Sequence, residues 1–252
     1  MNNTERFLSE INKVYDCDGL TKFRIGNKSD GGYVLLKELC NKVNTIYSIG
    51  IGDDVSFEVD FISKYPDTWF KMFDPTIDRL PDKHDRFIFY KSDIQALELS
   101  EIPDNSLLKM DIEYSEWDNL LSLDEKVYKK FSQMLIEFHI VDIPNKQGMS
   151  PYFSNFYDKI YEDMNEVLFG FYYRVLQGLN ELFYIFHIHA NNSLPKIEVG
   201  GRTFPPLLEV SFVRKDLVRD VITTYGDFPL SEIDFPNKTD RPDITNVYPL
   251  GG

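Results

Sequence analysis

Cysteine, histidine and tryptophan are scarce in this chain, and long apolar runs are missing. Its 252 residues include two cysteines, four histidines and two tryptophans. Cys17 and Cys40 are too few for a disulfide framework and are not spaced as a metal knuckle, which fits a reducing compartment. No run of about 18 apolar residues occurs, and the first residues lack the basic start and apolar stretch of a secretory signal. We therefore expect a cytoplasmic protein without a membrane span.

Positive charge is also in deficit. The chain has 41 acidic and 27 basic residues, which gives a net charge of −14. Affinity for nucleic acids depends on clustered lysine and arginine, so we do not expect a nucleic acid as partner. A small molecule is the expected partner, and the sequence leaves the oligomeric state open, a homo-oligomer included.

Short apolar runs alternate with helix-compatible segments through the middle of the chain. We expect helices over 54–65 and 115–130, and strands near 45–50, 69–73, 86–90, 106–111, 132–139, 181–190 and 207–213. This alternation is typical of an α/β fold with a mainly parallel sheet and helices on both faces. In such folds the ligand crevice lies at the carboxyl ends of the strands.

We expect one domain in three parts. Residues 1–43 would form an N-terminal cap or lid, and residues 44–213 the Rossmann-like core. The aromatic, helix-periodic segment 150–178 predicts a helical insertion that roofs the site. Residues 214–252 would form a helix followed by an irregular tail, because four prolines follow Gly226.

The most informative motif ends the first core strand. Residues 47–58 read Tyr-Ser-Ile-Gly-Ile-Gly-Asp-Asp-Val-Ser-Phe-Glu, a buried strand that breaks into a glycine turn and then begins a helix. Gly50 and Gly52 permit backbone angles and a close ligand approach that a Cβ forbids. Asp74 ends the next strand 24 positions after Gly50, where a carboxylate can accept both hydroxyls of a ribose.

This turn departs from the dinucleotide fingerprint. Val55 stands at the position of the third glycine, and Asp53 and Asp54 would repel a pyrophosphate. NAD is therefore disfavoured. A cationic nucleoside without phosphate suits the turn, and S-adenosylmethionine is the common cofactor with these properties.

The segment from residue 24 to residue 36 contains Asp30-Gly31-Gly32, a strong turn signal. The signal favours a hairpin turn. The alternative is a lid or wall that presents Arg24, Asp30 or Tyr33 to a ligand.

Three strand ends carry pairs of acids or imidazoles: Asp111 with Glu113, Glu137 with His139, and His187 with His189. The two members of each pair lie on the same side of an extended chain. Burial of so many polar groups without a functional role would cost free energy, so the pairs indicate a functional site. One of the last two histidines is expected to be a core residue, and we favour His189 as the functional one, because Asn191 and Asn192 follow it.

Two chemical roles are open for these residues. In the first, His139 or His189 is a general base that removes the proton of a sugar hydroxyl. In the second, Asp111, Glu137 and His139 hold a divalent cation such as Mg²⁺ or Mn²⁺, which chelates a substrate diol.

Five segments of the chain form an ordered series: 47–58, 73–76, 109–117, 133–139 and 187–192. This series resembles the motifs of FkbM-type and methyltransferase-like-24-type proteins, over roughly residues 24–213. The resemblance implies the class I methyltransferase fold, with seven strands of which the last is antiparallel. In bacterial relatives it commonly implies O-methylation of a sugar. One departure is Tyr114, where many relatives have glycine.

These arguments together assign three groups of residues. The expected cofactor contacts are Gly50, Gly52, Asp53, Phe57, Asp74, Asp93 and Asp111. The resemblance places Asp93 near the adenine, and a helix N-cap is the alternative. The expected substrate contacts are Arg24, Asp30, Tyr33, Glu113, Tyr114 and Asn191. The expected catalytic residues are Asp111, Glu137, His139 and His189.

The sequence thus predicts an S-adenosylmethionine-dependent O-methyltransferase. The resemblance adds a carbohydrate acceptor, either a nucleotide-activated sugar or a sugar of a capsular or other surface polysaccharide. One rival is a metal-dependent hydrolase or isomerase built on Asp111, Glu113, Glu137 and His139. Another is a non-catalytic module that binds the cofactor.

Overall fold

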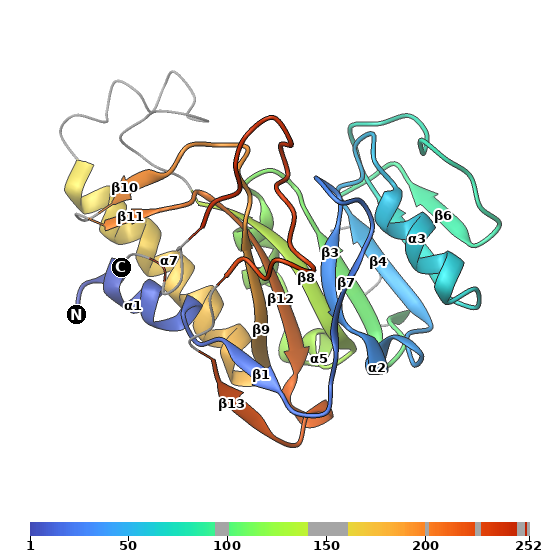
Figure 1. Ribbon diagram of the computed structural model, residues 1–252, viewed down its shortest axis with the longest axis horizontal. Coiled ribbons are helices and arrows are strands. Elements are labelled where there is room, and N and C mark those ends of the chain that lie inside the picture. The colour runs from blue at the N-terminus through green and yellow to red at the C-terminus, as the bar shows by residue number, and fades with distance from the viewer. Residues whose placement is uncertain (94–100, 141–160, 200–201, 225–227, 246–249, 251–252) are drawn as a thin grey trace.

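A central sheet with helices packed around it dominates the computed structural model (Figure 1). The structure describes residues 1–93, 101–140, 161–199, 202–224, 228–245 and 250.

The central sheet has seven strands in the order β6-β5-β4-β7-β8-β12-β9. They are β4 (Thr45–Ile49), β5 (Trp69–Phe73), β6 (Phe87–Tyr90), β7 (Ser106–Met110), β8 (Phe131–His139), β9 (Phe183–Ala190) and β12 (Leu207–Arg214). β12 runs antiparallel to both of its neighbours, whereas β6, β5, β4, β7 and β8 pair in parallel. Every residue of β4, β7 and β8 is buried, as expected of a sheet that is covered on both faces. The predicted seven-stranded sheet with an antiparallel last strand is confirmed.

Helices follow the strands in the alternating pattern that the sequence predicts. Helix α3 (Ser56–Lys64) follows β4, and the helix expected over 115–130 is present as α4 (Glu116–Ser122) and α5 (Glu125–Tyr128). The break has a local cause. The Asp124 side chain accepts a hydrogen bond from the Val127 backbone N–H, so Asp124 caps a new helix.

The predicted helical insertion over residues 150–178 contains a helix, and its role as a roof over the site stays a prediction. Its described part belongs to one helix, α7 (Tyr161–Leu182), which connects β8 to β9, and residues 150–160 lie outside the described residues. Phe169, Tyr172 and Leu176 pack into the main hydrophobic core. α7 lies beside α1 (Asn3–Ile11) and covers the sheet (Figure 1). In the described part of the segment, Phe169 and Tyr172 are therefore core residues.

Short elements complete the chain. β2 (Lys22–Ile25) and β3 (Tyr33–Leu36) form the hairpin that the glycine pair predicts, and α2 (Lys37–Cys40) follows. A second hairpin joins β10 (Ile197–Val199) to β11 (Arg202–Phe204). Among the described helices, α7 included, none has the length and apolar character that a membrane crossing needs.

The prediction of a helix after residue 214 is wrong for the residues that the structure describes there. This segment contains the 3₁₀ turn η4 (Lys215–Leu217) and then β13 (Val221–Thr223). β13 pairs with β1 (Tyr15–Cys17) in a two-stranded sheet. Pairing with this N-terminal strand gives the segment a strand in place of the expected helix. From residue 228 onward the described residues contain no helix or strand, in agreement with the irregular tail that the prolines predict.

Phe7 provides a test of the packing between α1 and α7. It is fully buried, and its ring lies 5.2 Å from that of Phe169 and 6.3 Å from that of Trp117. We predict that Phe7→Ala lowers the free energy of unfolding by about 3–5 kcal/mol, because it opens a cavity in the core. Val167→Ala, at a site on α7 that is 73% exposed, is the control and is expected to change stability little. Urea denaturation measures both, and equal stabilities of the two variants would contradict the described packing.

Candidate functional site

A cavity of about 610 Å³ opens where the glycine turn meets the ends of β5 and β7. The strand order of the sheet reverses between β4 and β7, and such switch points form the ligand crevice of open α/β sheets. The volume lies within the roughly 300–1,000 Å³ that small-molecule sites occupy. The lining includes most of the residues between Gly50 and Asp54 and between Phe73 and Thr76.

The backbone of the glycine turn itself forms part of the cavity wall. Gly50 has a φ of 78°, and a Cβ there would lie 1.6 Å from the Asp111 carbonyl oxygen, so only glycine fits. Gly52 has a φ of 57°, and a Cβ there would meet no atom within 4 Å. The second glycine therefore leaves open space at the cavity, as a turn that passes beneath a ligand requires.

Asp74 ties this turn to the end of β5. Its Oδ2 accepts hydrogen bonds from the backbone N–H groups of Ile51 and Gly52 at 2.9 and 2.8 Å. Its Oδ1 accepts from the backbone N–H and the hydroxyl of Thr76 at 2.7 and 2.6 Å. Burial alone would raise the pKa of Asp74, but these hydrogen bonds outweigh it and lower the pKa to about 2. Asp74 thus holds the shape of the turn, and a direct bond to a ribose stays a prediction.

Lys109 is a site residue that the sequence reasoning missed. It is buried in β7, lines the cavity, and its Nζ lies 3.8 Å from Glu58 Oε1 on α3. Its Nζ also lies 5.3 Å from the centre of the Tyr33 ring. A lysine within the otherwise apolar run 107–110 was the available signal, because a buried charge needs a partner.

His139 is held by a second residue that the sequence reasoning did not assign, Glu116. Glu116 is buried at the start of α4, and its Oε1 lies 3.0 Å from His139 Nδ1 and accepts from the Ile112 backbone N–H at 3.0 Å. A carboxylate only accepts, so Nδ1 carries the proton. The other ring nitrogen, Nε2, lies 3.2 Å from Glu113 Oε2. The signal for Glu116 was its place three residues after Glu113 in the segment 109–117.

The charges around His139 favour its protonated form. Burial alone would lower the pKa of His139, but the hydrogen bond to Glu116 and the charges of Glu116, Asp111 and Glu113 outweigh it and raise the pKa. His139 does not line the cavity itself. One of its nitrogens lies within 4.8 Å of oxygens of Asp111 and Glu137, and Asp111 does line the cavity.

Asp111 and Glu137 come together as the strand-end spacing predicts. Burial raises the pKa of Asp111 to about 6, although Lys109 and His139 act in the opposite direction. Burial, and then the charges of Asp111 and Glu209, raise the pKa of Glu137 well above its ordinary value. Asn191, an expected substrate contact, instead donates a hydrogen bond to Glu137 Oε1 at 2.9 Å.

The choice of His189 as a candidate base needs correction. Its Nδ1 lies 3.1 Å from Glu209 Oε2, and its Nε2 lies 3.2 Å from Asp243 Oδ1. Burial acts against protonation, but these two carboxylates outweigh it and raise the pKa of His189 to about 10. Both ring nitrogens of His189 are therefore engaged by largely buried carboxylates. His187 pairs with Asp234, so both histidines of β9 anchor the C-terminal tail.

The expected cofactor contact Phe57 is also corrected. Its side chain is 1% exposed and packs against Tyr33 and Phe61 in the core, because the first turn of α3 directs it inward. Arg24 does not line the cavity; its guanidinium donates to the carbonyl oxygens of Asn27 and Ser29 and holds the β2–β3 turn. The cavity is lined by these other predicted residues: Asp30, Tyr33, Gly50, Gly52, Asp53, Asp74, Asp93, Asp111 and Glu113.

Tyr114 stands where the resemblance predicts glycine, and the backbone of this turn has the conformation that favours glycine. Glu113 and Tyr114 have φ angles of 50° and 76°, a left-handed conformation that costs residues other than glycine about 1–3 kcal/mol. The turn that they form brings the Tyr114 ring to 4.9 Å from the His139 ring. Strain is therefore concentrated beside the imidazole.

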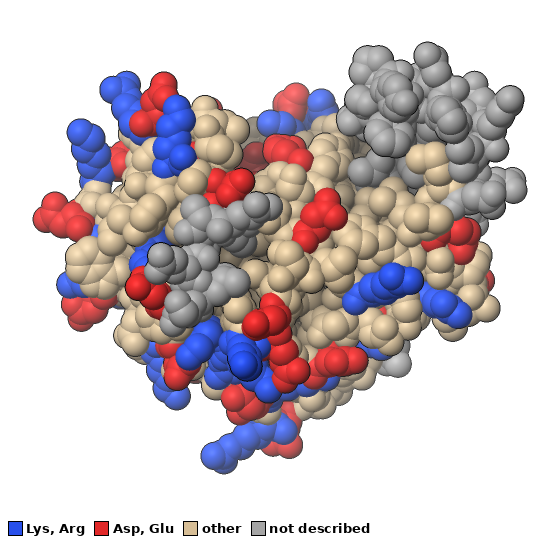
Figure 2. Space-filling view, turned by 180° about the vertical axis from the view of Figure 1, so that it is seen from behind, with Lys and Arg blue, Asp and Glu red and all other residues tan. Residues whose placement is uncertain are grey.

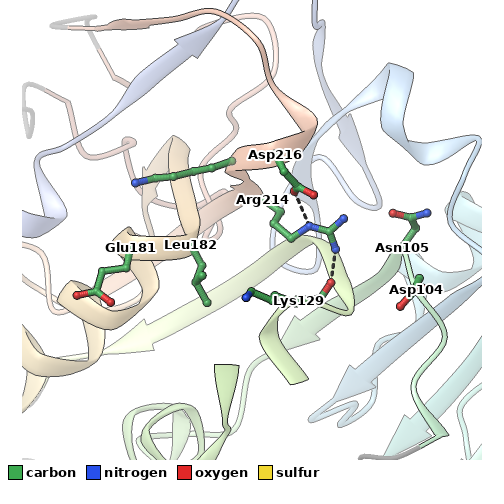
Figure 3. Close-up of a pocket in the computed structure, with 8 residues that line it drawn as sticks. Asp104, Asn105, Lys129, Glu181, Leu182, Arg214 and Asp216 are labelled. Atoms are coloured by element: carbon green, nitrogen blue, oxygen red, sulfur yellow. Dashed lines mark hydrogen bonds and ion pairs between the residues drawn. The ribbon is translucent and has the colours of Figure 1, made fainter. Parts of the chain in front are cut away.

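A second hollow, of about 500 Å³, lies at the opposite ends of the central strands, and Figure 3 shows the residues that line it. It is lined by residues that precede β7 and β8 and by residues that follow β12, such as Asn105, Lys129 and Arg214. Arg214 is engaged there by Asp216 and by the Lys129 carbonyl oxygen (Figure 3). This hollow is remote from the carboxyl ends of the parallel strands, so the candidate site is the larger cavity.

The sheet order and the antiparallel β12 decide the fold. The chain has the class I methyltransferase fold. The sequence itself matches no protein-family model and no curated protein. The resemblance to FkbM-type proteins therefore stays a prediction.

Solved structures with low similarity to this chain include methyltransferases. The fibrillarin pre-rRNA processing protein of Methanococcus jannaschii aligns with a TM-score of 0.43 and 10% identity over 70% of this chain and 68% of that chain. A putative rRNA-methylase from Clostridium thermocellum gives a TM-score of 0.37 and 12% identity over 68% and 86%. Human N-acetylserotonin methyltransferase, solved with S-adenosylmethionine, gives 0.34 and 11% over 84% and 51%. At these values the likenesses decide neither activity nor substrate.

The hydrogen bonds of Asp74 predict a pH-dependent stability. A carboxyl whose pKa falls from 3.8 to about 2 on folding stabilises the folded state by roughly 2 kcal/mol above pH 3.8, and this contribution is lost as the pH falls toward 2. We expect Asp74→Asn to be less stable than the parent by about that amount at pH 7, and the gap to narrow at pH 3. Urea unfolding at the two pH values measures the difference in stability between variant and parent, and Asp67→Asn, at an exposed position, is the control. A gap of the same size at both pH values would contradict the described role of Asp74.

Proposed function

We propose that this protein transfers a methyl group from S-adenosylmethionine to a hydroxyl group of a carbohydrate. The observation that supports the proposal most strongly is the buried Glu116–His139 pair beside the cavity at the β4/β7 switch point. A carboxylate that orients an imidazole is the arrangement of a general base.

The fit of the cofactor to the cavity rests on two features. Gly52 leaves open space at the wall, and the carboxylates that line the cavity suit a ligand that carries positive charge. Gly50, Gly52, Asp53, Asp93 and Asp111 would hold S-adenosylmethionine, and Asp74 would keep the turn in shape. When bound, this cofactor supplies an electrophilic methyl group.

The charge of the cavity also bears on the acceptor. Among the described lining residues one lysine, Lys109, faces seven carboxylates, which belong to Asp30, Asp53, Asp54, Asp74, Asp93, Asp111 and Glu113. A phosphate group would meet net repulsion there. We therefore favour a neutral sugar, such as a residue of a surface polysaccharide, over a nucleotide-activated one.

Proton transfer to the His139 imidazole would take two steps, the displacement of Glu113 and then the acceptance of the hydroxyl proton. Glu113 covers Nε2 at 3.2 Å, and its side chain is 81% exposed, so its displacement by an acceptor hydroxyl opens Nε2 to the cavity. With its proton on Nδ1 held by Glu116, neutral His139 accepts the hydroxyl proton at Nε2. Glu116 and Asp111 then stabilise the imidazolium, which is the same interaction that raises the pKa of His139.

The proposal also covers the partner of this protein and its location in the cell. We propose a cytoplasmic enzyme that acts on a small-molecule or glycan substrate and does not bind nucleic acid. On the face in Figure 2, the lysine and arginine side chains of described residues are interspersed with acidic ones and do not form a continuous basic surface. That pattern supports the proposal, because phosphate-backbone binding needs clustered positive charge.

A variant of His139 tests the base. We predict that His139→Gln lowers the rate of methyl transfer by about 10²–10⁴-fold and leaves the affinity for S-adenosylhomocysteine unchanged. The release of S-adenosylhomocysteine with a panel of neutral glycosides and polysaccharide fragments measures the rate. His84→Gln, at an exposed histidine, is the matched control. Full activity of His139→Gln would rule out the base.

Glu116 tests the same assignment through pH. In the parent, kcat/KM is expected to rise with pH through a pKa above 6.5, because only neutral His139 accepts a proton. In Glu116→Gln the charge that raises this pKa is gone, so the acidic limb is expected to move to lower pH while the maximal rate falls. A pH profile measured with saturating S-adenosylmethionine gives both quantities, and an unmoved acidic limb would contradict the pairing.

A further inference from the structure

We propose that Asp30, Glu137 and Glu209 form a binding site for one divalent, oxygen-preferring cation, of the Mg²⁺ or Mn²⁺ class. One oxygen of each carboxylate lies within 4.8 Å of the others. The three residues come from different parts of the fold, namely the β2–β3 turn, β8 and β12.

The sheet register places the two glutamates directly opposite each other. Glu137 and Glu209 are Cα partners across the antiparallel β8–β12 pair, and they are only 4% and 6% exposed. Like charges at directly opposed positions destabilise a sheet, and whereas Glu209 pairs with His189, Glu137 has no cationic partner among the described residues. Asp30 adds a third acid from the exposed side, where an ion from solvent can enter.

Amide groups hold the three carboxylates in place. Asn191 Nδ2 donates to Glu137 Oε1 at 2.9 Å. Asn237 Nδ2 donates to Glu209 Oε1 at 2.5 Å and to Asp30 Oδ1 at 3.1 Å. Supporting hydrogen bonds of this kind orient metal ligands. The second oxygens of Glu137 and Asp30 form no hydrogen bond with any residue that the structure describes, so they are available to a cation.

Two further polar groups of this cluster lack partners. The Tyr33 side chain is 4% exposed and lines the cavity with Asp30, yet its hydroxyl forms no hydrogen bond within the described part of the chain. Its phenol lies close enough to Glu137, Glu209 and Asp30 to feel their charges. Asn237 Oδ1 is also buried without a partner. The unsatisfied Asn237 oxygen costs about 1–3 kcal/mol, and a hydrated cation would offer a water to Tyr33, which lines the cavity.

The sequence suggested a different ligand set, Asp111, Glu137 and His139, whose donor atoms also lie within 4.8 Å of one another. In that set Nδ1 is held by Glu116, and a cation on Nε2 would occupy the nitrogen from which His139 is proposed to accept the proton. The all-carboxylate set leaves His139 free to act as base and matches the oxygen ligands that Mg²⁺ and Mn²⁺ prefer.

The role of the cation rests on the proposed function, whereas its binding does not. Mg²⁺ and Mn²⁺ take six ligands and commonly keep several waters. Coordination positions that face the cavity would therefore be open to a pair of neighbouring hydroxyls on the acceptor. The cation would orient the sugar and offset the carboxylates around it.

Calorimetric titration of MnCl₂ into the full chain, after treatment with EDTA and desalting, tests the site. We expect one saturable Mn²⁺ per chain, with affinity reduced more than about tenfold in Asp30→Asn. That variant keeps an oxygen for Asn237 and changes an exposed turn, so it is expected to fold. Asp78→Asn, an exposed position next to Lys91, removes the same charge and is expected to bind like the parent.

Three results would overturn the proposal: no saturable Mn²⁺ binding by the parent, parent-like affinity in Asp30→Asn, or an equal loss in Asp78→Asn. A loss in Asp111→Asn with none in Asp30→Asn would move the ion to the other ligand set. S-adenosylhomocysteine binding, measured on each protein in metal-free buffer, separates failure of the cation site from failure of the proposed function.

Discussion

Burial of carboxylates at the carboxyl ends of the strands is the constraint on which this structure depends. An ionised carboxylate in a protein interior must be paired or hydrogen-bonded. Asp74 meets this demand with the N–H groups of the glycine turn, and Glu116 meets it with His139. Glu209 does so with His189 and Asn237. Each pairing fixes a loop against the sheet, so the charges that shape the cavity also hold its walls together.

These pairings divide the cavity into two functional halves. On the β4–β5 side, Asp74 and the glycine turn form a rigid wall with open space beside Gly52. On the β7–β8 side, strained backbone at Glu113 and Tyr114 brings a carboxylate and an aromatic ring against His139. A preformed wall suits a cofactor that is used in every cycle, whereas a side chain that can be displaced suits an acceptor that must reach the base.

The sequence was most informative where local pattern determines structure. Apolar runs predicted all seven strands of the sheet, and the glycine turn and the paired acids were placed at the correct strand ends. Side-chain partners from distant segments could not be predicted: the tail residue Asp243, which pairs with His189, lies 54 positions further on. Phe57 was expected to contact the cofactor although it is a core residue, because burial depends on packing that spacing alone does not show. Lys109 was visible as a charge beside apolar residues and Glu116 as an acid in the segment 109–117, yet their partners were not.

The most direct test of the central claim is calorimetric binding of S-adenosylhomocysteine to the parent and to Gly52→Asn. Asparagine tolerates the left-handed backbone at this position, and its side chain would enter the open space of the cavity without a clash with the protein. We predict one equivalent bound by the parent and none by a folded variant. No binding by the parent, or equal affinity in both proteins, would contradict the assignment of this cavity to the cofactor.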